Sequence, residues 1–440
     1  MSALSLAELL TLTKDGEWGA DEGDASTVPM LVIRGTDFAD VRYGDLSSVP
    51  IRYIPSAIAA RKQLQPGDIL IETAGGTRDQ PTGRTVLLKA NLFVEASNPI
   101  TCASFSRFLR VNRDLIYPDY FFWFLQYLYL TGDMYPYHVQ HTGVARFQYT
   151  QFATQTLIPR PSPKKQEAIA DLLNALEDKI ELNRRINQTL ETIARALFQD
   201  WFLDFGPIHS KLEGQQAYLA SDIWSIFPST VDSDGTPHGW RMGELCEIVE
   251  FNPKEPIAAG TLAPYLDMAA LPTSGSISDP PVERAFTSGM RFRNHDTLLA
   301  RITPCLENGK AAYVQTLQGN ALGWGSTEFI VMRPLPPVPK PYSYLLARDP
   351  SFRNRAIQSM TGTSGRQRAR TDVLMQHPVA IPDSSIWAAF GSMVEPMFGH
   401  IRANGEEMQT LVQMRDILLP KLMSGEIGLD DAAVRIQEAL

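Results

Sequence analysis

Four loops of this sequence carry arginine, lysine, asparagine or glutamine, the side chains that bind phosphate groups and the edges of bases. In most of them the polar side chains stand beside glycine, which lets a backbone approach a ligand closely. They are therefore candidate contacts with nucleic acid. The twelve residues are Arg78, Gln80, Arg84, Arg146, Gln148, Arg301, Asn308, Lys310, Arg366, Gln367, Arg368 and Arg370.

The loop from Gly362 to Arg370 is the strongest candidate, because its arginines stand among small residues. Each loop also has a simpler interpretation. The segment from Gly75 to Arg84 could be a solvated hairpin, and the segment from Arg301 to Lys310 a structural turn between strands. The aromatic side chains Trp123, Phe124 and Trp324 fit a hydrophobic core better than a platform for stacked bases.

Catalytic motifs do not occur in the sequence. It has no Asn/Asp-Pro-Pro-Tyr/Phe run for methyl transfer to an amino group, no Gly-x-x-x-x-Gly-Lys-Ser/Thr loop for ATP and no Gly-x-Ser-x-Gly elbow. Cys102, Cys246 and Cys305 are far apart, which is unsuitable for a zinc site or a disulfide framework. We expect a chain that is not an enzyme by itself and binds neither a metal nor a cofactor.

The charge distribution matters more than the total. A net charge of -9 over 440 residues argues by itself against nucleic-acid binding. Acidic residues, however, gather near the N-terminus and in the tail, whereas the stretch from Arg284 to Arg370 is rich in arginine. A locally basic surface is therefore compatible with the acidic total.

The longest apolar run, Tyr120 to Leu130, is shorter than the roughly 20 residues that a membrane-spanning helix needs. We expect a buried helix there. The N-terminus lacks the basic segment of a secretion signal, so the expected location is the cytoplasm, without membrane attachment.

The sequence repeats itself once, with a period of roughly 220 residues. Each half ends in a long predicted helix, one starting near Pro163 and the other after Pro382. In the first helix, apolar residues recur in a three-four pattern that includes Ile186 and Ile193, which predicts a heptad seam. Pro396 and Gly399 predict a kink near the start of the second helix.

When one helix is shifted onto the other, polar and apolar seam positions coincide, which predicts that the two helices pair in a coiled coil. The matched residues are Asn183 with Asn404, Leu190 with Leu411 and Leu197 with Leu418.

The segments before the two helices also correspond in order. Residues 66–71 match 294–299, residues 108–110 match 331–333, and the loop at 142–148 stands where the second half has 362–368. Between the halves, a polar, turn-rich stretch predicts a linker. The expected domains are a first lobe (1–157), a helix (158–204), the linker (205–239), a second lobe (240–380), a second helix (381–425) and a tail (426–440).

Three segments resemble the specificity subunits of type I DNA restriction-modification systems. Residues 163–205 resemble the central conserved region of these subunits, residues 418–427 resemble their C-terminal signature, and residues 300–310 resemble a loop in many of their target-recognition domains. The resemblance keeps its order over nearly the whole chain and is weakest in the first lobe.

The resemblance implies an α+β fold. Two target-recognition domains of mixed α/β structure would be joined by two long antiparallel helices in a pseudo-two-fold arrangement. Each domain would read one half of a bipartite double-stranded DNA site, and the helices would dock two modification (methyltransferase) subunits, with room for two restriction subunits. S-adenosylmethionine, and ATP with Mg²⁺ where a restriction subunit is present, would bind to those partners.

Two other hypotheses remain open from the residues. A scaffold protein would use the paired helices to dock partners and would give the lobes protein ligands. A self-contained nuclease or methyltransferase is disfavoured by the missing motifs. Four charged residues of the first helix could form a solvated face or contact partner subunits: Lys164, Lys165, Arg184 and Arg185.

Overall fold

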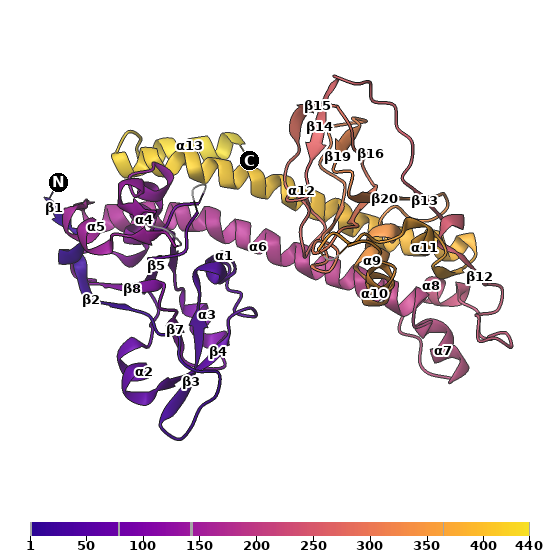
Figure 1. The fold of residues 1–440 in the computed structure, drawn as a ribbon, viewed down its shortest axis with the longest axis horizontal. Coiled ribbons are helices and arrows are strands. Elements are labelled where there is room, and N and C mark those ends of the chain that lie inside the picture. Colours follow the sequence, from indigo (N-terminus) through magenta and orange to yellow (C-terminus); the bar gives the residue numbers. More distant parts are fainter. Residues whose placement is uncertain (1, 78–79, 141–143, 364, 440) are drawn as a thin grey trace. The chain divides into compact units, whose positions relative to one another are not determined.

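A computed structural model describes residues 2–77, 80–140, 144–363 and 365–439 of the chain. Helices and strands alternate along it, so the expected α+β class is confirmed (Figure 1). The chain forms two compact units: unit 1 is Met1–Glu181 with Gln409–Leu440, and unit 2 is Leu182–Met408. Each unit therefore contains one lobe and a part of each long helix.

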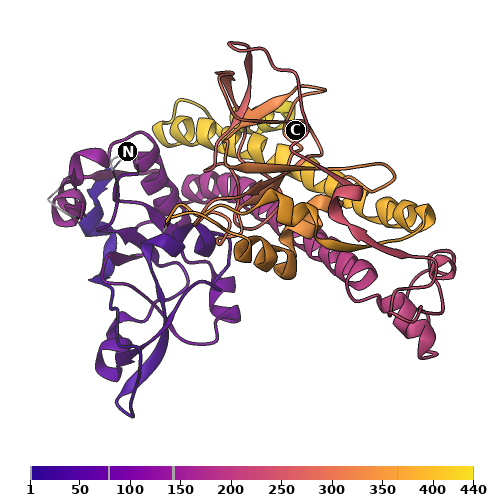
Figure 2. The same ribbon diagram turned by 45° about the vertical axis from the view of Figure 1, so that its right-hand side comes forward.

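Two helices form the predicted helical regions: α6 (Pro163–Phe202) and α12 (Ser384–Ser424). Residues 426–440, expected as a tail, contain a further helix, α13 (Leu429–Ala439). In Figure 2, as in Figure 1, α6 and α12 are the two longest helices. The first lobe contains α1 (Phe38–Arg42), α2 (Ser56–Lys62), α3 (Ala90–Glu95), α4 (Pro118–Leu130), α5 (Tyr149–Gln155), β1 (Ser2–Ser5), β2 (Leu10–Asp15), β3 (Thr27–Ile33), β4 (Ile51–Pro55), β5 (Ile69–Glu72), β6 (Thr85–Leu87), β7 (Ile100–Cys102), β8 (Ser106–Val111), β9 (His138–Val139), β10 (Arg146–Phe147) and β11 (Leu157–Arg160).

The second lobe has a similar set of elements. These are α7 (Gly206–Leu212), α8 (Ser221–Ile226), α9 (Tyr342–Arg348), α10 (Pro350–Gln358), α11 (Thr371–Met375), β12 (Arg241–Glu244), β13 (Val249–Phe251), β14 (Leu262–Leu266), β15 (Val282–Ala285), β16 (Met290–Phe292), β17 (Thr297–Ala300), β18 (Ala311–Tyr313), β19 (Gly323–Gly325), β20 (Phe329–Pro334) and β21 (Pro378–Ile381).

The two lobes share most of their sheet topology, and the second lobe adds β16 at a sheet edge, beside β19. A four-stranded antiparallel sheet has the order β2-β8-β5-β6 in the first lobe and β13-β20-β17-β18 in the second. In a second sheet, β3 pairs antiparallel with β4 and parallel with β7, as β14 does with β15 and β19. The terminal pairs β1-β11 and β12-β21 also correspond. The sequence repeat is thus a repeat of topology.

A buried ion pair recurs at the same place in both lobes. The Asp68 carboxylate accepts hydrogen bonds from Nε and Nη2 of Arg110 at 2.8 and 2.7 Å, and the Asp296 carboxylate accepts the same bonds from Arg333, both at 2.6 Å. Both aspartates are about fully buried, and a buried carboxylate must be paired and hydrogen-bonded. The pair therefore joins the turn before the third strand of each sheet to its neighbouring strand.

The turn before each of these aspartates has a left-handed backbone. Gly67 has φ +90°, and the matching residue of the second lobe, His295, has φ +76°. Glycine adopts this conformation freely, whereas a residue with a side chain rarely does. A ring nitrogen of His295 lies 3.0 Å from the Tyr313 hydroxyl, a contact that fixes the strained residue in place.

Helix α6 begins at Pro163 as predicted. Proline suits the first turn of a helix, because the backbone N–H that it lacks would have no acceptor within the helix there. In unit 2 the last turns of α6 pack on the start of α12. The ring of Phe202 is stacked on Trp387 with centroids 4.8 Å apart and meets Phe390 edge to face, also at 4.8 Å. These rings belong to the main hydrophobic core of unit 2. Helix α12 is one continuous helix through Pro396 and Gly399.

Two further segments bear on the expected organisation. Residues 205–239, expected as a linker, contain α7 and α8, and Ile208 and Phe227 are buried in the core of unit 2. The aromatic run at Tyr120 to Leu130 forms most of α4 and is largely buried, as expected. No helix among the described residues is long and apolar enough to cross a membrane.

Candidate nucleic-acid interface

The structure joins the candidate loops into one junction in each lobe. In the first lobe the amide of Phe147 donates to the carbonyl of Thr73 at 2.9 Å, and the amide of Gly75 donates to that of Ala145 at 3.2 Å. The loop that follows β5 is therefore fastened to the segment that carries Arg146.

The second lobe repeats these two hydrogen bonds. The amide of Ala369 donates to the carbonyl of Arg301 at 2.7 Å, and the amide of Thr303 donates to that of Gln367 at 3.0 Å. Isolated β-bridges link Ala74 with Arg146 and Ile302 with Arg368. The two loops that the sequence suggests for each lobe thus lie together, at equivalent positions of the repeat.

In the first junction, Gln80, Arg146 and Gln148 are exposed, and their side chains have no hydrogen-bond or ion-pair partner among the described residues. Arg78 lies outside the described residues. A cleft runs beside Arg146 and Gln148, and it is also lined by Phe105, which is 59% exposed. These side chains are free to bind a ligand.

Arg84 is held inside the lobe. Its Nε and Nη2 donate to the buried carboxylate of Glu72 at 2.9 and 2.6 Å, and Nη2 also donates to the carbonyl of Gly35 at 3.1 Å. The hydrogen bonds with Glu72 raise the pKa of Arg84. Because Glu72 needs this counter-charge, the Arg84 guanidinium stabilises the fold and is not presented to a ligand.

In the second junction Arg366 is the exposed arginine whose side chain is unpaired within the described chain. Arg368 instead donates from Nη2 and Nε to the carboxylate of Glu328 at 2.6 to 3.0 Å. This hydrogen bonding lowers the pKa of Glu328. Arg370 pairs with Asp372, and both side chains are about half exposed, so a ligand could compete for that guanidinium.

The loop from Arg301 to Lys310 presents one of its three candidates to solvent. Asn308 is exposed at the tip. Lys310 turns inward, where its Nζ donates to the carbonyl of Met268 at 2.7 Å. Arg301 is partly buried, and its Nε has no acceptor among the described residues. Trp123, Phe124 and Trp324 are buried, which confirms that they belong to the core.

The matched asparagines of the two helices bond across the helix pair in unit 2. Nδ2 of Asn183 donates to Glu407 at 2.6 Å, and Nδ2 of Asn404 donates to Oδ1 of Asn187 at 2.8 Å. Each asparagine thus pairs with a residue other than its match. Leu190 and Leu197 pack against the unit 2 core, and Leu411 and Leu418 are buried.

The prediction that Ile186 and Ile193 lie in the seam between the two helices is wrong. They are 38% and 42% exposed, and Leu182, 51% exposed, lies one turn before Ile186 on the same face. Ile180, Asn183 and Ala194 are buried instead. Apolar residues on two faces of one helix make the seam ambiguous in sequence, and the exposed set forms an apolar stripe on α6.

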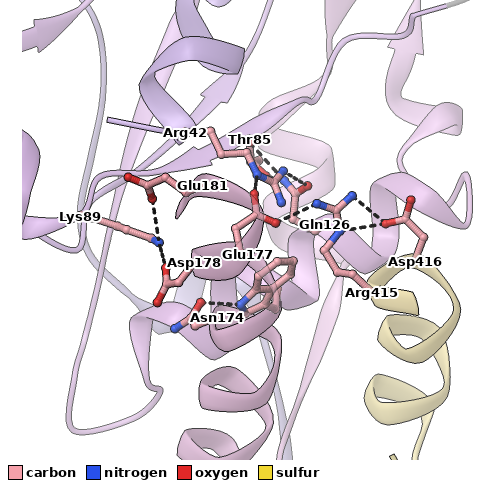
Figure 3. Close-up of polar contacts among 11 residues, drawn as sticks. Arg42, Thr85, Lys89, Gln126, Asn174, Glu177, Asp178, Glu181, Arg415 and Asp416 are labelled. Atoms are coloured by element: carbon pink, nitrogen blue, oxygen red, sulfur yellow. Dashed lines mark hydrogen bonds and ion pairs between the residues drawn. The ribbon is translucent and has the colours of Figure 1, made fainter. Parts of the chain in front are cut away.

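A buried carboxylate that sequence reasoning missed joins three helices of unit 1 (Figure 3). Glu177 on α6 is 3% exposed and accepts hydrogen bonds from Arg42 on α1 and, at 2.7 Å, from Arg415 on α12. Arg42 also donates to Gln126 on α4 at 3.1 Å. The one signal in the sequence was a glutamate beside a seam position, between Leu176 and Ile180.

Beside this cluster, Nε1 of Trp123 on α4 donates to Asn174 on α6 at 2.9 Å, and Lys89 pairs with Asp178 (Figure 3). The first lobe is therefore fastened to the helices of unit 1 through polar groups as well as apolar packing.

Two similar lobes, each followed by a long helix, define the two-lobed class to which type I specificity subunits belong. The comparisons confirm the resemblance. The chain is 24% identical over 353 residues to the type I restriction enzyme MjaIX specificity subunit of Methanocaldococcus jannaschii, which covers 76% of this chain and 75% of that protein. It is 25% identical over 315 residues to the HindI specificity subunit of Haemophilus influenzae, covering 61% of this chain and 68% of that protein.

A solved structure shares the fold. The S subunit of a type I restriction-modification system from M. genitalium has a TM-score of 0.53 at 13% sequence identity, covering 96% of this chain and 95% of that one. No family model matches the chain. The chain is thus a relative of type I specificity subunits, which are non-catalytic components of restriction-modification enzymes.

Proposed function

We propose that this chain reads a bipartite DNA site for a type I restriction-modification complex, with one half-site read by each lobe. One observation carries this proposal: equivalent loop junctions in the two lobes present exposed arginine, glutamine and asparagine side chains. Arginine binds guanine edges and phosphates, and asparagine and glutamine bind adenine edges. A duplicated reader suits a target with two parts.

The junctions also account for DNA binding by an acidic chain. Phosphate contacts depend on local cations, and the total charge of -9 does not prevent them. Arg146 in the first junction and Arg366 in the second supply guanidinium groups that have no partner in the described part of the chain. Arg370 can join them, since its pairing with Asp372 is exposed to solvent.

The helices would have two roles. As a spacer, α6 would be about 60 Å long at about 1.5 Å per residue, enough to separate two DNA contacts by more than one helical turn. As a dock, the stripe of Leu182, Ile186 and Ile193 on α6 offers exposed apolar side chains that a helix of a modification subunit could cover.

The chemistry would belong to the partners. Two modification subunits would bind S-adenosylmethionine and methylate the DNA, and restriction subunits, where present, would use ATP and Mg²⁺. The lobes of this chain would decide where that chemistry takes place.

The decisive experiment is methylome sequencing of cells that express this chain together with its neighbouring modification subunit. We expect a single modified motif made of two short specified parts and an unspecified gap. Methylation without preference for any split motif would refute the proposal. A scaffold role would be favoured if Arg146→Ala and Arg366→Ala left the DNA affinity of the complex unchanged.

A further inference from the structure

Arg348, at the end of α9, is a half-buried residue whose side chain collects several backbone contacts in unit 2. Its Nη1 donates to the carbonyls of Thr273 at 2.9 Å and Gly309 at 2.6 Å. Its Nη2 donates to the carbonyls of Ala311 at 2.8 Å and of Gly275. The guanidinium therefore fastens two separate loops to each other, although it pairs with no carboxylate among the described residues.

One of these loops is the candidate reading loop with Asn308 at its tip. The loop is fixed at its first end by the bonds of Arg301 and Thr303 to the Gln367 to Ala369 segment. Arg348 fixes its other end, immediately after Asn308. The direction in which Asn308 points thus depends on a half-buried side chain of a neighbouring helix.

The Arg348 side chain also reaches the spacer helix through one intermediate residue. Nε of Arg348 donates to the hydroxyl oxygen of Tyr344 at 3.0 Å, and that hydroxyl donates to Glu191 of α6 at 2.6 Å. Tyr344 is fully buried and Glu191 nearly so. Burial, together with the neighbouring Glu191 carboxylate, raises the pKa of Tyr344 well above its usual value, so the hydroxyl stays protonated and keeps donating.

The described residues of the first lobe contain no equivalent of this network. The repeat places Phe121 and Leu125 of α4 where α9 has Tyr344 and Arg348, and both are buried apolar residues. The first lobe is fastened to α6 through Glu177 instead. A defect at Arg348 should therefore affect one lobe only.

We propose that Arg348 is a positioning residue for DNA readout by the second lobe, holding the Asn308 loop in its reading conformation and tying it through Tyr344 to Glu191 on α6. The residue does not touch DNA itself. This inference rests on the proposed function, because it assumes that the second lobe reads one half-site.

The test uses the full chain assembled with its modification subunits and DNA duplexes altered in one half-site at a time. Asn308→Ala identifies the half-site that the second lobe reads. Arg348→Met should lower discrimination at that same half-site by about tenfold, the size expected for loss of one base contact. Tyr344→Phe should lower it by a smaller factor, and discrimination at the other half-site should stay within about twofold.

A second measurement separates positioning from general destabilisation. Hydrogen exchange of the amides from Leu306 to Tyr313 should become faster in Arg348→Met, while the exchange of unit 1 stays unchanged. Arg241→Met removes an exposed arginine of β12 that pairs with Glu247, and it serves as the matched control without either effect.

Several outcomes would overturn the inference. Equal loss of discrimination at both half-sites in Arg348→Met would indicate a merely structural role. Wild-type discrimination in both Arg348→Met and Tyr344→Phe would show that the network has no role in DNA readout. An Asn308→Ala variant that discriminates normally at both half-sites would also contradict the inference. A wild-type complex without any split-site preference would instead refute the proposed function.

Discussion

Arg415 on α12 donates a hydrogen bond from Nη1 to the buried carboxylate of Glu177 on α6 at 2.7 Å. The other carboxylate oxygen accepts a hydrogen bond from Nε of Arg42 in the first lobe. Glu177 and Arg415 are separated by 238 positions in the chain. This contact joins the C-terminal part of unit 1 to its N-terminal part.

We expect Arg415→Met to destabilise unit 1 by about 3 kcal/mol, because removal of one partner leaves a buried carboxylate with less compensation. Urea unfolding of the purified chain measures the change. Arg402→Met on the same helix is the control. Arg402 forms an exposed pair with Glu406, so its loss should cost about 0.5 kcal/mol or less. Equal effects of the two variants would contradict a structural role for Glu177.

The same cluster predicts a pH dependence of stability. Burial by itself would raise the pKa of Glu177, but the charges and hydrogen bonds of Arg42 and Arg415 outweigh it and hold that pKa below its usual value. The stabilisation is therefore complete above the ordinary glutamate pKa of about 4.3 and is lost as the pH falls through the lower pKa of the folded protein. Unfolding of the wild-type chain and of Glu177→Gln, followed from pH 7 to pH 3, should converge at acid pH. Parallel curves would show that Glu177 does not titrate in this way.

Arg366→Ala should weaken DNA binding without changing stability, because the side chain has no partner among the described residues. If Arg366 contacts a phosphate, the slope of log K against log salt should fall by about 0.9. Titrations of the complex at several salt concentrations measure both values. Arg241→Ala should change neither. Arg368→Ala should mainly release Glu328 and lower stability only slightly, because exposed ion pairs contribute little to it. A larger loss of affinity in Arg368→Ala than in Arg366→Ala would reverse this assignment.

The apolar stripe on α6 predicts where a modification subunit binds. Ile186→Gln with Ile193→Gln should reduce co-purification of that subunit, since both exposed side chains would no longer gain from burial. The melting temperature of the chain alone should remain unchanged. Arg195→Gln, exposed on another face of α6, is the control. Undiminished assembly of the double variant would place the docking surface elsewhere.

Insertion of four residues into both α6 and α12, next to Leu182 and Gln409, tests the spacer role. Each insertion adds about 6 Å and close to one full helical turn. The unspecified gap in the methylated motif should lengthen by about two base pairs, at about 3.4 Å each, or methylation should cease. An unchanged gap with full methylation would exclude the helices from setting the distance.

The sequence by itself determined the duplication of the chain and the two long helices. The repeat, the proline start of α6 and the apolar character of α4 are local signals, and the structure agrees with each of them. The matched turns before Asp68 and Asp296 were also visible, because two segments of similar pattern stand at corresponding places in the repeat. Such features depend on neighbouring residues, so one sequence contains enough information to predict them.

Only the tertiary structure decided which polar side chains are free. Arg84 and Arg366 are both candidate DNA contacts in the sequence, yet Arg84 neutralises a buried glutamate and Arg366 faces solvent. The phase of the seam was decided in the same way, since Ile186 could face the partner helix or solvent. Ion pairs and burial depend on residues that are distant in the chain, such as Glu177 and Arg415, and no local pattern records which of them meet.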